Sequence, residues 1–183
     1  MTFSFFTIGH SNRSLEAFIE MLKAAEIQFV ADIRTIPRSR TNPQFNMETL
    51  RRDLGVHAIA YEHMPALGGL RGKTPNMPSG LNGLWTNESF HNYADYALSG
   101  QFHAGLEHLR DTGHKQRCAF MCSEAVWWRC HRRIVADYLI ASGETVHHIM
   151  EHGRIEPARL TPGAAVQPDG NIFYPARIDR TVE

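Results

Sequence analysis

Short apolar runs alternate with amphipathic segments along the first 150 residues. The apolar runs have the length of strands and cover residues 3–8, 27–33, 57–61, 118–122 and 144–150. Between them, apolar side chains recur every three or four residues, which predicts helices over residues 15–22, 47–54, 90–98, 102–109 and from about 126 to 141. Strands that alternate with helices are typical of a parallel sheet with both faces covered. We therefore expect a three-layer α/β fold, with a mostly parallel, Rossmann-like sheet of about five strands and helices on both faces.

Two segments interrupt this alternation. Residues 66–88 hold five glycines and two prolines, and a connection of this length is usually a functional lid or disordered, of which we favour the lid. After residue 152 the helical periodicity ends, and the turn sequence at residues 168–170 predicts a small hairpin or an extended tail. We expect one domain over residues 1–183, with an α/β core (1–152), a lid-like loop (66–88) and a C-terminal tail or hairpin (153–183).

Composition is that of an ordinary globular protein, with 43% hydrophobic and 21% charged residues. Lys plus Arg and Asp plus Glu both number 19, so no overall charge attracts nucleic acid or a membrane surface. The first residues lack a signal-peptide pattern, and no apolar run approaches the roughly 20 residues of a membrane span. Cys118 and Cys122 lie on one predicted strand, about 13 Å apart at about 3.3 Å per residue, too far for a disulfide. We expect reduced thiols and a cytoplasmic protein without a membrane partner.

Polar side chains gather just past the predicted strands. The carboxyl ends of parallel strands share one edge of the sheet, where open α/β sheets bind their ligands. Each of these residues also has an ordinary structural interpretation; Asp32, for example, would simply pair with a neighbouring arginine. The residues at this predicted edge are His10, Ser11, Asn12, Asp32, Arg34, Tyr61, His63, Cys122, Ser123 and Glu124.

The turn after the fourth predicted strand concentrates reactive groups. If the helix begins near Val126 or Trp127, then Cys130 lies about one turn into it, and its thiol can approach Cys122 at the strand end. The same register places Trp127, His131, Ile134 and Tyr138 on one helix face. Plain packing explains Cys130 equally well, because free cysteines are often buried and inert.

Five arginines lie on turns or helix starts near the same edge. Their guanidinium groups suit phosphate and carboxylate, and a helix N-terminus also favours an anion. The alternative is a set of weak surface ion pairs. Six residues separate Cys122 from Arg129, one more than a tyrosine-phosphatase loop requires, and the Cys and His spacing fits no standard zinc ribbon or finger. The five are Arg34, Arg38, Arg71, Arg129 and Arg132.

Four short blocks in this order resemble a bacterial and archaeal family known only as domain of unknown function 488. They are Thr-Ile-Gly-His-Ser-Asn at 7–12, Asp-Ile-Arg with Pro-Arg-Ser at 32–39, Leu-Gly-Gly at 67–69, and Cys-Ser-Glu with Cys-His-Arg at 122–132. The resemblance covers most of residues 5–150, although many relatives have a proline where Trp127 stands. It implies a three-layer α/β fold with a site at these blocks and no particular reaction.

Three hypotheses about function follow from these residues. The first is an enzyme, a hydrolase or thiol-dependent transferase acting on an anionic small molecule or a nucleic-acid end. Its first catalytic candidate is Cys122, a nucleophile or redox thiol whose pKa we expect the helix N-terminus and nearby arginines to lower. The other catalytic candidates are Glu124, His10, His131 and Asp32, and the substrate-binding candidates are Ser11, Asn12, Arg34, Arg38, Tyr61, His63, Arg71, Arg129 and Arg132. The second is a metal-binding protein with His10, Cys122, Cys130 and His131 as ligands. The third is a nucleic-acid-binding module that uses the 34–40 loop with Trp127 or Trp128 as stacking platforms. No cofactor or oligomeric state is indicated.

Overall fold

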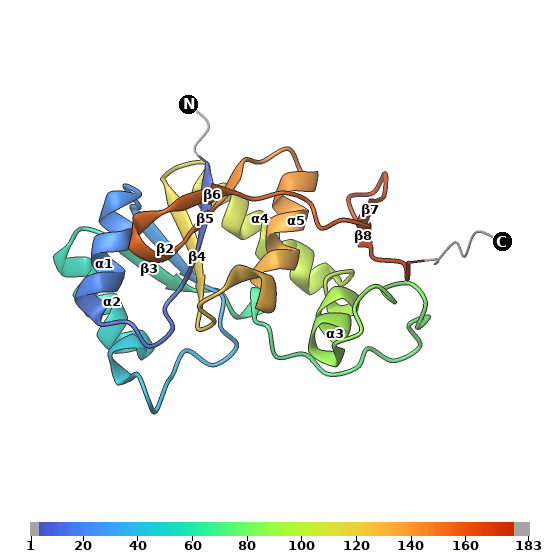
Figure 1. Ribbon diagram of the computed structural model, residues 1–183, viewed down its shortest axis with the longest axis horizontal. Helices are drawn as coiled ribbons and strands as arrows, with labels where there is room; N and C mark the ends of the chain where they lie inside the picture. The colour runs from blue at the N-terminus through green and yellow to red at the C-terminus, as the bar shows by residue number, and fades with distance from the viewer. Residues whose placement is uncertain (1–3, 178–183) are drawn as a thin grey trace.

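The computed structural model describes residues 4–177. Phe3 of the first predicted strand and residues 178–183 of the predicted tail lie outside the described residues. The main sheet has six strands in the order β3-β2-β4-β1-β5-β6 (Figure 1). Neighbours among the first five run parallel, and only β6 is antiparallel, to β5. The strands are β1 (Phe5–Gly9), β2 (Phe29–Asp32), β3 (Ala60–His63), β4 (Cys118–Cys122), β5 (Val146–Ile149) and β6 (Ile155–Pro157), with a separate pair β7 (Ala165–Val166) and β8 (Ile172–Phe173).

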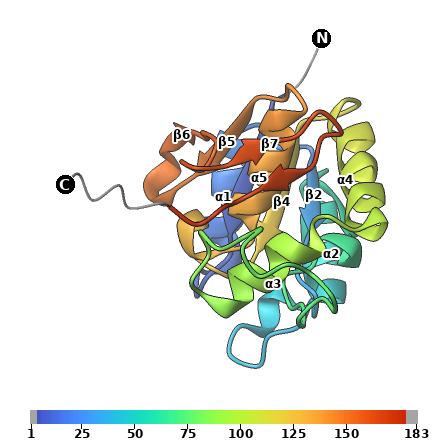
Figure 2. The same ribbon diagram turned by 90° about the vertical axis from the view of Figure 1, so that its right-hand side faces the viewer.

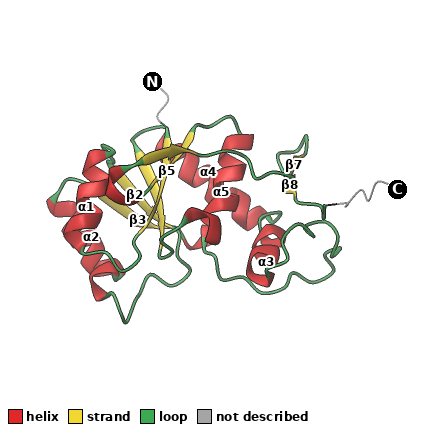
Figure 3. Ribbon diagram, in the orientation of Figure 1, coloured by secondary structure: helices red, strands yellow, loops and turns green. Residues whose placement is uncertain are grey.

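Helices cover both faces of the sheet, so the expected three-layer α/β fold is confirmed (Figure 3). In Figure 1, α1 and α2 lie on one side of the strands and α4 and α5 on the other. Figure 2 looks onto the side of the molecule that carries α3 and the β7–β8 hairpin. The helices are α1 (Leu15–Ala24), α2 (Met47–Val56), α3 (Glu88–Tyr96), α4 (Gly100–Gly113) and α5 (Arg132–Ala141).

Side-chain alternation along the central strand β4 sorts its residues between two cores. Ala119 and Met121 pack in the core that α1 and α2 cover. Cys118 and Phe120 pack in the core that α4 and α5 cover. Because side chains repeat every two residues along a strand, Cys122 points to the α5 side.

The neighbouring strand β2 places its last side chain on the opposite face. Ala31 packs in the α4–α5 core, whereas Val30 packs in the α1–α2 core. The same alternation directs Asp32 toward α1 and α2. Two polar groups at one sheet edge, Asp32 and Cys122, therefore belong to different layers.

The predicted beginning of the fifth helix is wrong. Trp127–Arg129 form only a short 3₁₀ turn, and α5 begins at Arg132. The backbone is extended on both sides of that turn, at Val126 (φ −103°, ψ 128°) and Cys130 (φ −128°, ψ 147°). The Trp127 ring stacks on His148 of β5 at 4.2 Å, which holds the turn against the sheet rather than on the helix. Trp127 therefore does not share a helix face with Ile134 and Tyr138.

Other local predictions are mostly confirmed. Ser14 caps α1 and accepts a hydrogen bond from the Ala17 N–H at 3.1 Å, and the two-stranded hairpin around residues 168–170 is present. The third strand lies at 60–63 rather than 57–61, because α2 continues to Val56 and Ala58 adopts a left-handed φ of 57°. Strand β6 was not predicted, since three residues ending in proline carry little strand signal.

The long 66–88 segment is anchored at both ends. Leu67 is fully buried in the α4–α5 core near its start. Near its end, buried Asn82 donates to Asp95 of α3 at 2.7 Å and accepts from the backbone N–H of Tyr174 in the tail at 3.1 Å. The segment and the tail are thus linked to each other and to the helical layer. Across residues 4–177, no helix combines the length and apolar character needed to cross a membrane.

Candidate functional site

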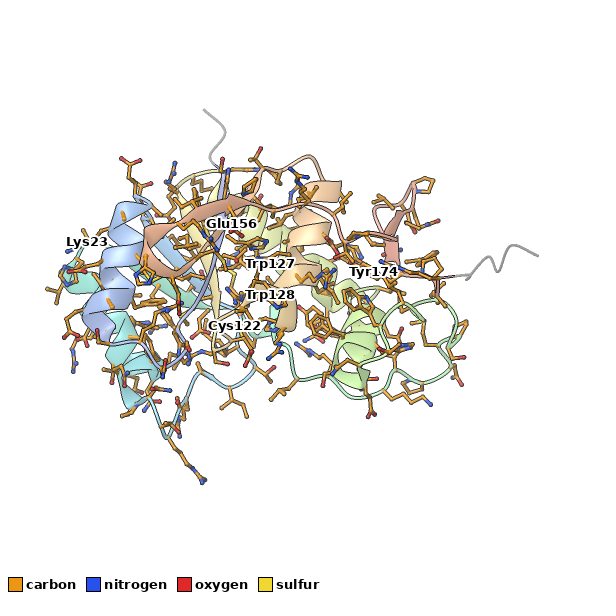
Figure 4. All side chains as sticks on the ribbon, viewed as in Figure 1. Lys23, Cys122, Trp127, Trp128, Glu156 and Tyr174 are labelled. Carbon is orange, nitrogen blue, oxygen red and sulfur yellow. The ribbon has the colours of Figure 1, made fainter. Side chains whose placement is uncertain are left out.

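Two cysteines and a histidine form a compact cluster at the end of β4. Figure 4 labels one of them, Cys122, below Trp127 and Trp128. Their Sγ and nitrogen atoms all lie within 4.8 Å of one another. Nδ1 of His131 lies 3.6 Å from Sγ of Cys130 and 3.9 Å from Sγ of Cys122. Both thiols are free and buried. The sequence-based expectation that the two thiols approach each other is met. We call these three residues the thiol cluster.

The orientation of His131 is fixed from three sides. Its Nε2 lies 2.9 Å from the carbonyl oxygen of Ile33, and because a carbonyl only accepts, Nε2 carries the proton. Tyr93 of α3 packs edge-on against the ring with centroids 5.0 Å apart. A Cβ at Gly69 would lie 2.4 Å from Nδ1 and 2.8 Å from both adjacent ring carbons, so this glycine covers the ring face. The in-plane lone pair of Nδ1 remains directed at the thiols.

Arg132 is the cation that contacts the thiol cluster. Its side chain is 1% exposed, and its Nε donates to Sγ of Cys130 at 3.3 Å. Its other nitrogens donate to the Glu124 carbonyl at 2.7 Å and to the Thr7 hydroxyl at 3.4 Å. Within residues 4–177, no carboxylate forms an ion pair with this guanidinium. The nearest group that can carry a compensating negative charge is the Cys130 sulfur.

The two thiols differ in acidity, in the opposite sense to the sequence-based expectation. Burial alone would raise the pKa of Cys130, but the hydrogen bond from Cys122 and the charge of Arg132 outweigh it and lower this pKa to about 6. The hydrogen bond to Cys130 and burial raise the pKa of Cys122 to about 12. The helix N-terminus and arginines were expected to lower the pKa of Cys122. They act on Cys130 instead, because α5 begins beyond Cys130 and Arg132 contacts that sulfur.

A second group of polar residues lies in the other layer of the same edge. The two carboxylate oxygens of Asp32 accept from Nε of Arg34 at 2.9 Å and from its terminal nitrogen at 2.6 Å. Tyr61 donates to the same carboxylate at 2.6 Å, and His63 donates from Nε2 to the Arg34 carbonyl at 2.7 Å. The pairing of Asp32 with a neighbouring arginine, one of the two sequence-based interpretations, is confirmed. We call Asp32, Arg34, Tyr61 and His10 the ion-pair cluster.

His10 is engaged through both ring nitrogens. Nδ1 donates to the Ser11 carbonyl at 2.7 Å, and Nε2 accepts from Arg34 at 3.3 Å. The ring stacks on Phe45 at 4.3 Å. Burial lowers the pKa of His10 to about 4, although the hydrogen bond to Ser11 opposes this shift. His10 is therefore neutral at pH 7, and it is not part of the thiol cluster.

A cavity of about 430 Å³ opens between the two clusters. Its size is within the usual range of small-molecule sites. His10 and Arg34 line one side, Cys122 and His131 the other, and Arg38 lies exposed at the rim. Another hollow, of about 500 Å³ beside α1, is not lined by any cysteine.

Several predicted site residues lie away from this cavity. Arg71 donates to two backbone carbonyls and stacks over Tyr96 at 3.7 Å, so its role is structural. The Glu124 side chain is exposed, and only its carbonyl contacts Arg132. Tyr61 and His63 lie within β3 rather than past its end. The predicted residues that do not line the cavity are Ser11, Asn12, Asp32, Tyr61, His63, Arg71, Glu124, Arg129, Cys130 and Arg132.

Sequence reasoning missed some residues that line the cavity. The apolar side chains of Ile36 and Leu70 are 59% and 71% exposed at its mouth. Thr35 and Gly69 bring the 66–88 segment against the site, because the Leu70 N–H donates to the Thr35 hydroxyl at 2.9 Å. Ser39 and Gly69 fall within the blocks that carry the family resemblance, which was the one available signal for them.

Comparison with known proteins gives a family and no activity. Searches among curated proteins and among solved structures found no match. The family described as "Domain of unknown function DUF488" matches residues 14–139, which contain every residue of the thiol cluster and three of the four resembling blocks. Since this match spans most of the chain, the protein belongs to the DUF488 family.

Proposed function

We propose that this protein is an enzyme that transfers or hydrolyses a group of a small anionic substrate, with Cys122 as the attacking thiol. One observation carries the proposal. Cys122 and His131 line the same cavity, with Nδ1 of His131 3.9 Å from the Cys122 sulfur and Nε2 held by the Ile33 carbonyl. A nucleophile, a base and a group that orients the base are the parts that covalent catalysis requires.

The lining of the cavity indicates the substrate class. Arg38 has no ion pair among the residues that the structure describes, and one nitrogen of Arg34 faces His10 rather than Asp32. These cations suit a phosphate or carboxylate. Ile36 and Leu70 add an apolar mouth. We infer a phosphate-bearing substrate with an apolar or aromatic portion, for which a nucleotide or a nucleic-acid end is a candidate.

In the proposed reaction, the Cys122 sulfur bonds to the electrophilic atom of the substrate and its proton passes to Nδ1 of His131. The leaving group departs with the electron pair of the broken bond, and water or an acceptor then releases the transferred group. Asp32 and His10 do not act as acid or base in this scheme. They hold Arg34, since their polar atoms face its guanidinium. The chemistry needs reduced thiols, for which we propose the cytoplasm.

Two alkylating reagents of similar size, one anionic and one neutral, test the proposal. Reduced protein treated with a chelator is reacted with iodoacetate, an anion, and with neutral iodoacetamide, and labelled cysteines are identified by peptide mass spectrometry. We expect Cys122 to react first although Cys130 has the lower pKa, because Cys122 lines the cavity and Cys130 does not. Cys122 should also favour iodoacetate more strongly than unfolded protein does. Cys122→Ser should abolish this preference, and Arg38→Ala should reduce it. First labelling at Cys118 or Cys130, or the reagent preference of the unfolded chain, would contradict the proposal.

A further inference from the structure

We propose that Cys122, Cys130 and His131 form a binding site for one thiophilic divalent cation of the zinc class. The ligand separations carry the inference. Tetrahedral zinc bonds of about 2.3 Å to sulfur and about 2.0–2.1 Å to nitrogen place neighbouring sulfur and nitrogen ligands about 3.6 Å apart. The observed sulfur–nitrogen distances are 3.6 Å for Cys130 and 3.9 Å for Cys122. Shifts of a few tenths of an ångström close the site.

The histidine already has the tautomer that a metal requires. Its proton is on Nε2, which donates to the Ile33 carbonyl at 2.9 Å, so Nδ1 offers a lone pair. Metal-binding histidines commonly donate their second nitrogen to a carbonyl or carboxylate in this way. Gly69 covers the ring face and leaves the plane of the ring clear. The hydrogen bond from Arg132 to the Cys130 sulfur supplies the equivalent support for one thiolate.

The donor set also selects the metal. Thiolate and imidazole suit zinc-class ions, whereas magnesium and calcium prefer oxygen ligands. Two cysteines and one histidine are three ligands, the number found in zinc sites that leave a fourth position open. Because Cys122 and His131 line the cavity, this fourth position is reached from the side where a substrate would enter. The sequence-based hypothesis named His10 as a fourth ligand. Both ring nitrogens of His10 are hydrogen-bonded, so it does not bind the cation and the fourth position stays open.

The cation site does not rest on the proposed enzyme. A bound cation and a covalently attacking thiol compete for the same sulfur atoms, so the metal-bound and thiol-reactive forms are separate states of the protein. The tests are correspondingly separate. The alkylation experiment uses chelator-treated protein, and the metal experiment reads an absorption spectrum without any substrate.

Cobalt(II) titration of the reduced, chelator-treated, full-length protein tests the site. We expect one cobalt ion per chain, with thiolate-to-cobalt charge-transfer absorption and the visible bands of a tetrahedral centre. Zinc should displace the cobalt, and excess magnesium should not. Cys130→Ser and His131→Gln should each weaken binding by more than about 100-fold, since losing an outer-shell partner alone costs about 10–100-fold. Cys118→Ala, on the same strand but outside the cluster, is the matched control and should bind cobalt normally.

The cobalt spectrum of the wild-type protein tests the cation site even if a variant fails to fold. Absence of charge-transfer absorption at one equivalent overturns the inference and leaves the alkylation result untouched. Equal cobalt affinity in wild type, Cys130→Ser and His131→Gln, with native circular dichroism, also overturns it. If the protein binds cobalt as expected but shows no preference for iodoacetate, the cation site is supported and the proposed enzymatic function is contradicted.

Discussion

Two buried arginines lie at the same edge of the sheet and are balanced in different ways. Arg34 is 5% exposed and is held by the Asp32 carboxylate through two of its nitrogens. Arg132 is 1% exposed, and its Nε points at the Cys130 sulfur. The first arginine has a permanent counter-ion in the α1–α2 layer. The second faces a group in the α5 layer that is negative only as a thiolate.

This difference separates a scaffold from a reactive centre. A buried charge is costly unless it is paired, and a carboxylate that pairs with arginine cannot leave without that cost. A thiolate at Cys130 can balance the same charge and still bind a metal, while the neighbouring Cys122 thiol lines the cavity and is available to attack an electrophile. The ion-pair cluster therefore shapes one wall of the cavity, and the thiol cluster supplies its chemistry.

Removing the fixed counter-ion should have the largest effect on stability. Asp32→Ala leaves Arg34 buried without a carboxylate, and we expect a loss of about 3–5 kcal/mol in the free energy of unfolding, measured by urea denaturation. The double variant Asp32→Leu/Arg34→Met removes both charges and should recover most of the loss. If Asp32→Ala costs less than about 1 kcal/mol, the pair is not the scaffold described above.

A single methyl group should damage the thiol cluster. In Gly69→Ala the new Cβ would lie 2.4 Å from Nδ1 of His131, so the ring or the 66–88 segment must move. We expect a loss of about 1–3 kcal/mol in stability, the scale of overpacking, together with loss of cobalt binding. Gly72→Ala is the matched control, because its Cβ would meet no atom within 4 Å. Equal behaviour of the two variants would show that Gly69 does not position His131.

Hydrophobic periodicity predicted the architecture because burial dictates it. The parallel sheet, the Ser14 cap and the hairpin around residue 169 each depend on patterns local in sequence. The start of α5 depends instead on Trp127 stacking against His148, a contact between residues far apart in the chain. Hydrophobic periodicity carries no information about such a contact. The predicted helix therefore included Cys130, whereas α5 begins only at Arg132.

The candidate site was predicted as a location more accurately than as a mechanism. The position rule for strand ends placed Cys122, His10 and Arg34 at one edge, and the turn after the fourth strand added His131. All four line the cavity. The rule could not separate the two layers, because that requires knowing which face each strand residue occupies. Nor could the rule decide whether Asp32 serves catalysis or pairs with a neighbouring arginine, which the structure answers by its ion pair with Arg34.

Buried His148 should make stability depend on pH on the thiol-cluster side. Burial lowers its pKa to about 3, with smaller contributions from Arg132 and His147. The unfolded chain protonates this histidine near its ordinary pKa of about 6.5, while the folded protein keeps it neutral. Its contribution to stability is therefore complete above pH 6.5 and is lost as pH falls toward 3. We expect a loss of about 1 kcal/mol between pH 7 and 5.5 from this residue. Urea denaturation of wild type, His148→Gln and the exposed control His57→Gln at several pH values isolates the contribution of His148. If the free energy of unfolding falls as steeply with pH in His148→Gln as in wild type, the assignment to His148 is wrong.

The smallest expected effect concerns the rim of the cavity. Arg38 is exposed and lines the cavity, whereas Arg129 is exposed and does not. Neither replacement by alanine should change the stability of the ligand-free protein by more than about 0.5 kcal/mol, the usual limit for surface positions. Phosphate should raise the melting temperature of wild type at fixed ionic strength, because the guanidinium groups of Arg38 and Arg34 line the cavity and would bind it. Arg38→Ala should reduce that stabilisation by up to about 1 kcal/mol, the scale of an exposed charge pair, and Arg129→Ala should leave it unchanged. If both variants respond to phosphate as wild type does, anions bind elsewhere, and the cavity between the two clusters is not the anion site.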